Sequence, residues 1–356
     1  MRRRKKYKRR SSSAFSRKVK LFGFGLVSVV VSVFVLLGFS FYKFLNAPFS
    51  NASGVLNVDG SAVWQEDFTN ILLVKLDDKN DKSSSINALT ILHMNNESKR
   101  YDLYKIPVDV DIEYGLNYGK GMLSDVYKVG NSNQERGFYL ISQTILKNLA
   151  INIDGYVALD NAGFDELSGI VGGIDANDLS VALRIKNYLK LPSLITKFRS
   201  LAITNITIID IFSILDFIKN TSEQSGSVFE LNVYQVLDSQ NWDSLWQSKM
   251  DFSSVQRETI KVFISNASKD PKIPGLAGWG SRVIKNIGGS VLDTQNSFVD
   301  FDENTIITDK VDSPLVNKIA KTFNIKHIVL VDDIKRESGI NPQVFRTSVS
   351  VVLTGY

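Results

Sequence analysis

Apolar runs separated by short polar turns dominate the chain from residue 68 onward. Residues 70–78 (NILLVKLDD), 88–95 (ALTILHMN) and 100–108 (RYDLYKIPV) read as buried strands. Apolar residues at spacings of three and four in GFYLISQTILKNLA predict an amphipathic helix over 137–150. DGYVALD and AGFDELSGIVGGID predict a further strand and helix. Strands that alternate with helices predict an α/β layered domain.

The pattern continues with two helices, a strand and a second module. NYLKLPSLITKFRSLA and IIDIFSILDFIKNT predict helices whose apolar faces form core or the wall of a lipid-tail pocket, and VFELNVYQVL predicts a strand. The polar stretch 239–257, which contains Trp242 and Trp246, predicts a helix or a linker between domains. From residue 258 strands and helices alternate again over about 100 residues, a length that can fold as a separate α/β domain.

One stretch, YKIPVDVDIE at 104–113, places three acids at every second position. Asp109, Asp111 and Glu113 would share one side of an extended chain. Two interpretations stay open at this point. The stretch is either the solvent-exposed face of a half-buried strand or an acidic group for metal binding or acid–base chemistry.

The N-terminal region predicts a membrane anchor. Leu21 to Phe41 is a run without a charged residue that is long enough, as a helix, to cross the roughly 30 Å of a bilayer core. No convincing cleavage site follows it, so we expect an uncleaved signal anchor over 21–43. The basic tail, 1–20, then lies in the cytoplasm, and a stalk over 44–67 leads to an extracytoplasmic bulk of the chain in the cell envelope.

Charge is distributed unevenly along the sequence. Residues 1–20 contain eleven of the 42 Lys and Arg residues and no acid, so the remainder carries a net charge of −6 rather than +5. The tail therefore predicts contact with anionic lipid, and we expect no nucleic-acid partner. The chain has no cysteine, which excludes thiol nucleophiles, disulfides and cysteine metal sites. His93 and His327 lie in apolar, strand-like runs, which predicts structural roles for both.

Successive segments resemble the blocks of the LytR-CpsA-Psr (LCP) family. These are NILLVKLDD, ALTILHMN, LYKIPVDV, GMLSDVYKVGN and LAINIDGYVALDNAGFDELSGIVGGID, in that order. TIKVFISNASKDPKIPGLAGWGSRVIKNIGGSV, with the closing VSVVLTG, is similar to the C-terminal domain of LytR-type proteins. The resemblance implies an LCP-like domain over 68–238 and a LytR-type domain over 258–356.

Members of that family transfer a glycopolymer from a polyprenyl pyrophosphate carrier to the cell wall, with Mg²⁺ at the pyrophosphate. The resemblance assigns Asp77 and Asp109 to family positions, as catalytic residues and as Mg²⁺ ligands if the metal is bound. It also shows where this chain lacks the charged residues of the family pattern. Ser85 and Asn87 stand in the arginine-serine-aspartate block, Val108 stands where an arginine follows the proline, and Met122 replaces a lysine.

Three functional hypotheses follow. The first is a catalytically degenerate, membrane-anchored family member that binds a lipid-linked or wall polymer, or a partner protein. The second is an active Mg²⁺-dependent phosphotransferase in which Lys75, Lys105, Lys120 or Arg136 replaces the missing cations. The third is a structural envelope component that acts through its C-terminal module.

Overall fold

The computed structural model describes residues 67–134, 136–171, 200–221, 226–250, 254–269, 273–297, 300–334 and 347–355. Residues 48–356 form one compact unit. The expected tail, anchor and stalk and most of the expected helix at 187–202 lie outside the described residues. Within the described ranges, every helix is too short or too polar to cross a membrane.

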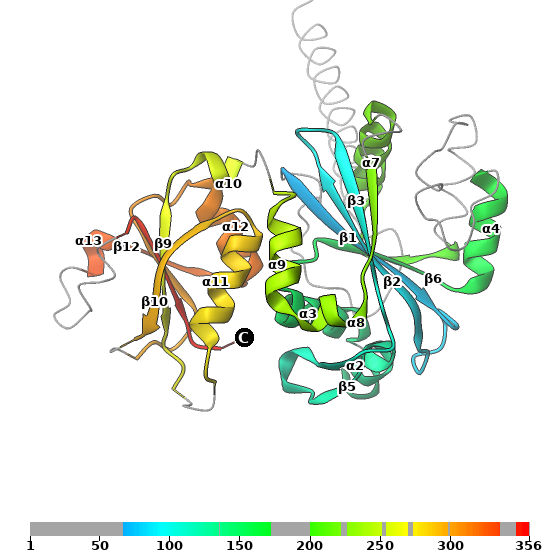
Figure 1. The fold of residues 1–356 in the computed structure, drawn as a ribbon, viewed down its shortest axis with the longest axis horizontal. Helices are drawn as coiled ribbons and strands as arrows, with labels where there is room; N and C mark the ends of the chain where they lie inside the picture. Colours follow the sequence, from blue (N-terminus) through cyan, green and yellow to red (C-terminus); the bar gives the residue numbers. More distant parts are fainter. Residues whose placement is uncertain are drawn as a thin grey trace, which may run out of the picture. The chain divides into compact units, whose positions relative to one another are not determined.

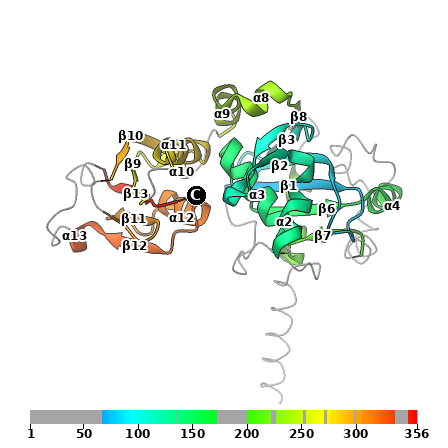
Figure 2. The same ribbon diagram turned by 90° about the horizontal axis from the view of Figure 1, so that it is seen from below.

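A six-stranded mixed sheet organises the first domain. Its order is β7-β6-β1-β2-β3-β8, and the strand labels follow this order in Figure 2. The strands are β1 (Phe68–Leu76), β2 (Ile86–Asn95), β3 (Arg100–Ile106), β6 (Gly155–Leu159), β7 (Ile203–Thr204) and β8 (Gly226–Glu230). β2 is antiparallel to both β1 and β3, so β1 and β3 end at the same edge of the sheet. The prediction of a mixed α/β fold is confirmed.

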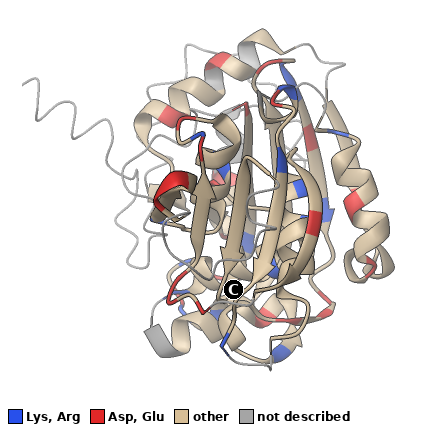
Figure 3. Ribbon diagram, turned by 90° about the vertical axis from the view of Figure 1, so that its left-hand side faces the viewer, with Lys and Arg blue, Asp and Glu red and all other residues tan. Residues whose placement is uncertain are grey.

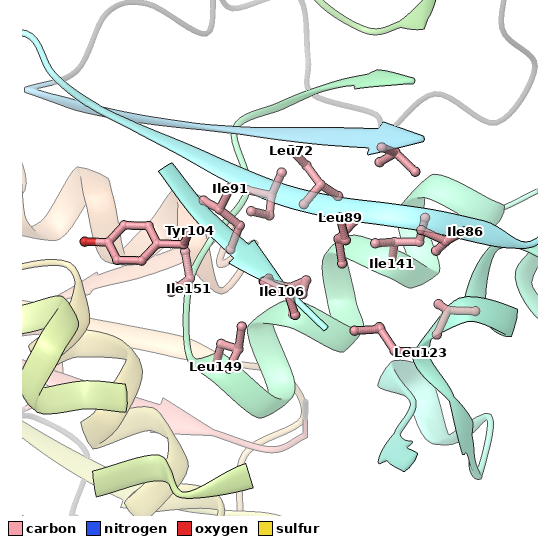
Figure 4. Close-up of a cluster of buried hydrophobic side chains, with 14 of the residues drawn as sticks. Leu72, Ile86, Leu89, Ile91, Tyr104, Ile106, Leu123, Ile141, Leu149 and Ile151 are labelled. Atoms are coloured by element: carbon pink, nitrogen blue, oxygen red, sulfur yellow. The ribbon is translucent and has the colours of Figure 1, made fainter. Parts of the chain in front are cut away.

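Alternating side chains of the central strands supply two cores. Leu72, Val74 and Tyr104 face the helices α2 (Val126–Gln134) and α3 (Gly137–Leu149), and Figure 4 shows the side chains of this cluster. Ile71, Leu92 and Leu103 face the opposite side, where they cluster with Phe217 of α7 (Ile208–Asn220). Because strand side chains alternate between faces, nearly continuous apolar runs such as NILLVKL are buried on both sides.

The stretch YKIPVDVDIE is not one continuous strand. β3 ends at Ile106, immediately before Pro107, which has no N–H to donate to a ladder. Asp111–Glu113 form β4, which pairs with β5 (Lys120–Met122) in a separate two-stranded hairpin. Two 3-10 turns follow β4 and β5, namely η1 (Gly115–Asn117) and η2 (Leu123–Asp125). The three acids therefore do not line one strand face, and Glu113 forms an ion pair of 2.8 Å with Lys147.

The strand expected over VFELNVYQVL ends halfway. Its second half is the short helix α8 (Val233–Leu237), because Asn232 and Gln235 form a reciprocal capping box at its start. The stretch expected to be a helix or linker contains α9 (Ser239–Gln247) and α10 (Ser254–Arg257). Trp242 and Trp246 of α9 are fully buried in the core that α3 covers. Figure 1 shows α9 beside α3.

The expected C-terminal domain is built around a separate five-stranded sheet of order β10-β9-β13-β11-β12. Its strands are β9 (Lys261–Asn266), β10 (Ser290–Asn296), β11 (Thr305–Thr308), β12 (His327–Leu330) and β13 (Val349–Leu353). Its helices are α11 (Leu276–Asn286), α12 (Pro314–Thr322) and α13 (Val331–Ile334). Figure 3, viewed from this side, shows positive and negative residues interspersed over the described ribbon. The alternation of strands and helices that the sequence predicts from residue 258 is confirmed.

Candidate functional site

Asp77 lies at the edge of the sheet where β1 ends. Its main-chain N–H donates to the carbonyl of Ser85, 3.1 Å away, across the turn that leads into β2. Its carboxylate accepts a hydrogen bond of 2.6 Å from the side-chain amide of Asn87. Asp77 and Asn87 are both exposed. Two positions that the resemblance singled out are therefore in direct contact, through a neutral donor rather than a cation.

Ser85 connects this pair to the segment after β5. Its hydroxyl lies 3.5 Å from a carboxylate oxygen of Asp125, at the end of η2. The preceding residue, Ser124, donates its N–H to the carbonyl of Val108 at 2.9 Å. Asp125 was missed in the sequence analysis. Its position in the GMLSDVYKVGN block, immediately before a helical run, was the available signal.

Val108 stands at the position where the resemblance predicts an arginine, and its contacts there are structural. Its side chain is half-buried and packs against the core on the α3 side, while its carbonyl holds Ser124. Asp109, the next residue, is exposed and accepts no hydrogen bond from the described residues. Met122 is 39% exposed, and its carbonyl accepts a 2.8 Å hydrogen bond from the Tyr114 hydroxyl. We take Asp77, Ser85, Asn87, Val108, Asp109 and Asp125 together as the candidate site.

Cations near the end of β1 are engaged elsewhere. Lys79 forms an ion pair with Asp160 at 3.1 Å, where β6 ends. Burial would raise the pKa of Asp160, but the N–H of Gly163 and the Lys79 ammonium hold this pKa below its usual range. Lys75 lies over the ring of Phe164, 5.5 Å from its centroid. None of these interactions places a positive charge on Asp77.

The other proposed replacement cations lie at separate positions. Lys105, at the end of β3, forms an exposed ion pair of 2.9 Å with Glu230 of β8. Lys120 is exposed on β5, and Arg136 is exposed immediately before α3. Within the described ranges of the first domain, Arg136 and Arg100 are the only arginines, and Arg100 lies at the opposite end of β3 from Asp109.

A Mg²⁺ ion would find few protein ligands at the candidate site. The described residues contain no group of three or more His, Asp or Glu side chains arranged to hold a metal. Mg²⁺ is commonly bound by one or two carboxylates together with phosphate oxygens of a ligand. Asp77 and Asp125, which Ser85 connects, are compatible with this second mode, in which the phosphate ligand would supply the remaining oxygens. No contact among the described residues places Asp109 beside them.

The two histidines lie away from the site. His93 is buried and stacks on Phe68, and its Nδ1 lies 2.7 Å from the side-chain oxygen of Asn70. Burial lowers the pKa of His93 to about 3, so the ring is neutral at physiological pH. His327 is exposed on β12, with its Nδ1 3.3 Å from the Thr305 hydroxyl.

Comparison with known proteins supports the first resemblance over part of the chain. Residues 51–181 match the model of the LytR_cpsA_psr family. This match does not reach the C-terminal domain, so the LytR-type assignment of residues 258–356 stays a prediction. No curated protein is similar enough in sequence to match the chain.

Several solved structures are distantly similar to this one. The transcriptional regulator YvhJ from Bacillus subtilis has 17% identity over 47% of this chain and 84% of its own, with a TM-score of 0.36. Protein gbs0355 from Streptococcus agalactiae has 14% identity over 46% and 77%, with a TM-score of 0.38. The LytR-CPS2A-psr family protein YwtF (TagT), solved with a bound octaprenyl pyrophosphate lipid, has 16% identity over 51% and 84%, with a TM-score of 0.34.

Proposed function

We propose that this chain is a membrane-anchored cell-envelope protein that uses its LytR_cpsA_psr domain to bind a lipid-linked or wall polymer, with little or no phosphotransfer. The family match over residues 51–181 supports the ligand class. The uncharged run from Leu21 to Phe41 supports the anchor.

The observation that carries the proposal is that no described Lys or Arg side chain forms an ion pair with Asp77 or Asp109 at the candidate site. A pyrophosphate requires several charge-assisted hydrogen bonds, and arginine provides them in bidentate form. Here an amide contacts Asp77, a half-buried valine occupies position 108, and the described lysines nearby contact other groups. Since the loss of one preorganised donor costs about 10² to 10³ in rate, several such losses favour binding over catalysis.

The α7 side of the sheet offers an apolar surface for a lipid chain. Ile208, Ile211 and Ile214 of α7 are only half-buried, and Phe212 is 51% exposed. An apolar helix with this exposure differs from an ordinary core helix, whose apolar side is fully covered. We propose that a polyprenyl chain lies along α7.

Binding and transfer can be measured separately on the full-length protein in lipid nanodiscs. We expect it to bind a polyprenyl pyrophosphate, and to transfer glycopolymer from a pyrophosphate-linked donor with Mg²⁺ at no more than about 1% of the rate of a family member that has the arginines. Phe212→Asp should weaken binding. The control Tyr234→Asp, at an 83% exposed aromatic position on α8, should not. Transfer at the full family rate would contradict the proposal.

A second candidate, an active transferase, is favoured by one feature. Lys75 and Lys105 each come two residues after a leucine, Leu73 or Leu103, that packs on the α7 side. Residues two apart in a strand share a face, so both lysines project from the α7 side near the ends of β1 and β3. In that case Asp77→Ala or Asp109→Ala should abolish transfer with almost no change in melting temperature. Lys75→Met should reduce it severely.

A further inference from the structure

Side chains from outside α3 cap its C-terminal end. The last carbonyl groups of a helix have no partner within the helix. The carbonyl of Leu149 accepts hydrogen bonds from the indole of Trp242 at 2.8 Å and from the side-chain amide of Asn286 at 3.3 Å. The carbonyl of Asn148 accepts one from Arg282 at 3.2 Å, and that of Leu146 accepts one from the indole of Trp279 at 3.3 Å.

The residues that cap α3 belong to α9 and to α11 of the C-terminal domain. These two helices also contact each other. Asp243 of α9 binds the Arg282 guanidinium through two contacts, of 2.7 and 3.0 Å. The indole of Trp246 donates to the carbonyl of Asn286 at 2.9 Å. The positive charge of Arg282 also lies at the negative end of the α3 dipole, where a cation is favourable.

The apolar packing follows the same arrangement. Leu146 and Ala150, at the end of α3, belong to the hydrophobic core of the C-terminal domain, together with residues such as Leu276 and Ile284 of α11. Ala150 has a left-handed backbone conformation with φ of 54°, where glycine is usual. The end of α3 is therefore shaped by contacts with the C-terminal domain.

The same turn of α3 holds the β4–β5 hairpin. Lys147 forms an ion pair of 2.8 Å with Glu113, and the side-chain amide of Asn148 donates to the carbonyl of Glu113 at 2.7 Å. One turn earlier, the Thr144 hydroxyl accepts the N–H of Gly115 at 3.0 Å. The carbonyl of Asn148 thus accepts a hydrogen bond from Arg282, while its side-chain amide donates one to the β4–β5 hairpin.

The hairpin leads directly into the candidate site. After β5 the N–H groups of Leu123 and Ser124 donate to the carbonyls of Val110 and Val108, each at 2.9 Å. Asp125 follows and lies beside Ser85. A continuous series of contacts therefore runs from Arg282 through Asn148 and Glu113 to Val108.

We infer that the C-terminal domain positions one side of the candidate site through α3, with Arg282 as the positioning residue and Asn148 as the link to the β4–β5 hairpin. A change in the C-terminal domain that loosens Arg282 would then loosen residues 110–125. This inference does not depend on whether the site binds, transfers or does neither.

Amide hydrogen exchange on the full-length protein in nanodiscs tests the inference without a ligand. Arg282→Met and Asn148→Ala should each accelerate exchange in residues 110–125 by about tenfold or more, while exchange in β2 stays unchanged. Arg257→Met is the matched control, because it removes another arginine, one that pairs with exposed Glu97 in the β2–β3 turn. It should leave residues 110–125 unaffected.

Two outcomes would overturn the inference. The first is faster amide exchange in Arg282→Met that is confined to α9, α11 and the last turn of α3. The second is equally faster exchange of residues 110–125 in Arg257→Met. If Arg282→Met does not fold, Trp279→Phe replaces it, since it keeps an aromatic ring and removes the indole N–H that donates to Leu146. It should accelerate the same segment by a smaller factor, and no change there would also contradict the inference.

Discussion

The side-chain amide of Asn87 donates a 2.6 Å hydrogen bond to the carboxylate of Asp77, at the edge of the sheet where β1 ends and β2 begins. The family resemblance places charged groups in this block, and the chain uses a neutral contact. The Asn87 amide satisfies the Asp77 carboxylate, and the main-chain N–H of Asp77 separately holds the turn by donating to the carbonyl of Ser85.

Adding positive charge at this edge should strengthen pyrophosphate binding. We expect the double variant Ser85→Arg, Val108→Arg to bind geranylgeranyl pyrophosphate with Mg²⁺ about 10- to 100-fold more tightly, since a hydrogen bond to a charged group contributes about 1.5–3 kcal/mol. Isothermal titration calorimetry gives the dissociation constants. The control Ser85→Gln, Val108→Gln adds length without charge, and an equal gain there would contradict an electrostatic cause.

Trp246 should be critical for stability. Trp246→Phe removes the donor to the buried carbonyl of Asn286, and an unsatisfied buried acceptor costs about 1–3 kcal/mol. Urea unfolding of residues 48–356 should show this loss in one transition that includes both domains. Tyr234→Phe, on the exposed surface of α8, should change the free energy of unfolding by less than about 0.5 kcal/mol. Two separate transitions would mean that the domains unfold independently.

His93 should make the protein sensitive to acid. Burial lowers its pKa from 6.5 to about 3 in the folded state, so between these values the unfolded chain binds a proton that the folded chain does not. The free energy of unfolding should therefore fall as pH decreases from 6.5 to 3, by at most about 1.4 kcal/mol per pH unit from this group. His93→Gln should flatten this slope in denaturant titrations at several pH values. His327→Gln should retain it, because His93 is still present.

Lys318 should produce a slope in the alkaline range. Burial, with the nearby charge of Lys321, lowers the pKa of Lys318 from 10.5 to about 7. Between about pH 7 and 10.5 the unfolded chain holds a proton that the folded chain has released, so stability should rise with pH. Lys318→Met should remove this rise. Lys285→Met, at an exposed position on α11, is the control, and a rise that persists in Lys318→Met would assign the effect to other groups.

Lys321, whose charge acts on Lys318, takes part in an ion pair with a buried carboxylate. Its ammonium lies 3.2 Å from a carboxylate oxygen of Asp154, which is almost fully buried. Removing one partner of a buried ion pair leaves the other charge uncompensated. Lys318→Met leaves this pair intact, which is why Lys318 rather than Lys321 is the residue to change.

The local pattern by itself determined most of the regular elements. Continuous apolar runs became β1, β2 and β3, and apolar spacings of three and four became α3, because burial of one face is encoded in a few neighbouring residues. A proline and a capping box explain the two local errors. Pro107 ends β3, and the pair Asn232 and Gln235 converts the second half of an expected strand into α8.

Only the tertiary structure decided what the polar residues and tryptophans do. Nothing in DSQNWDSLWQ indicates that one indole would cap α3 and the other would bind α11, since the acceptors are 93 and 40 residues away along the chain. The contact of Asp125 with Ser85 spans 40 residues in the same way. Apolar periodicity is a property of neighbouring residues, whereas a hydrogen-bond partner is chosen by where distant segments meet, and that depends on the whole fold.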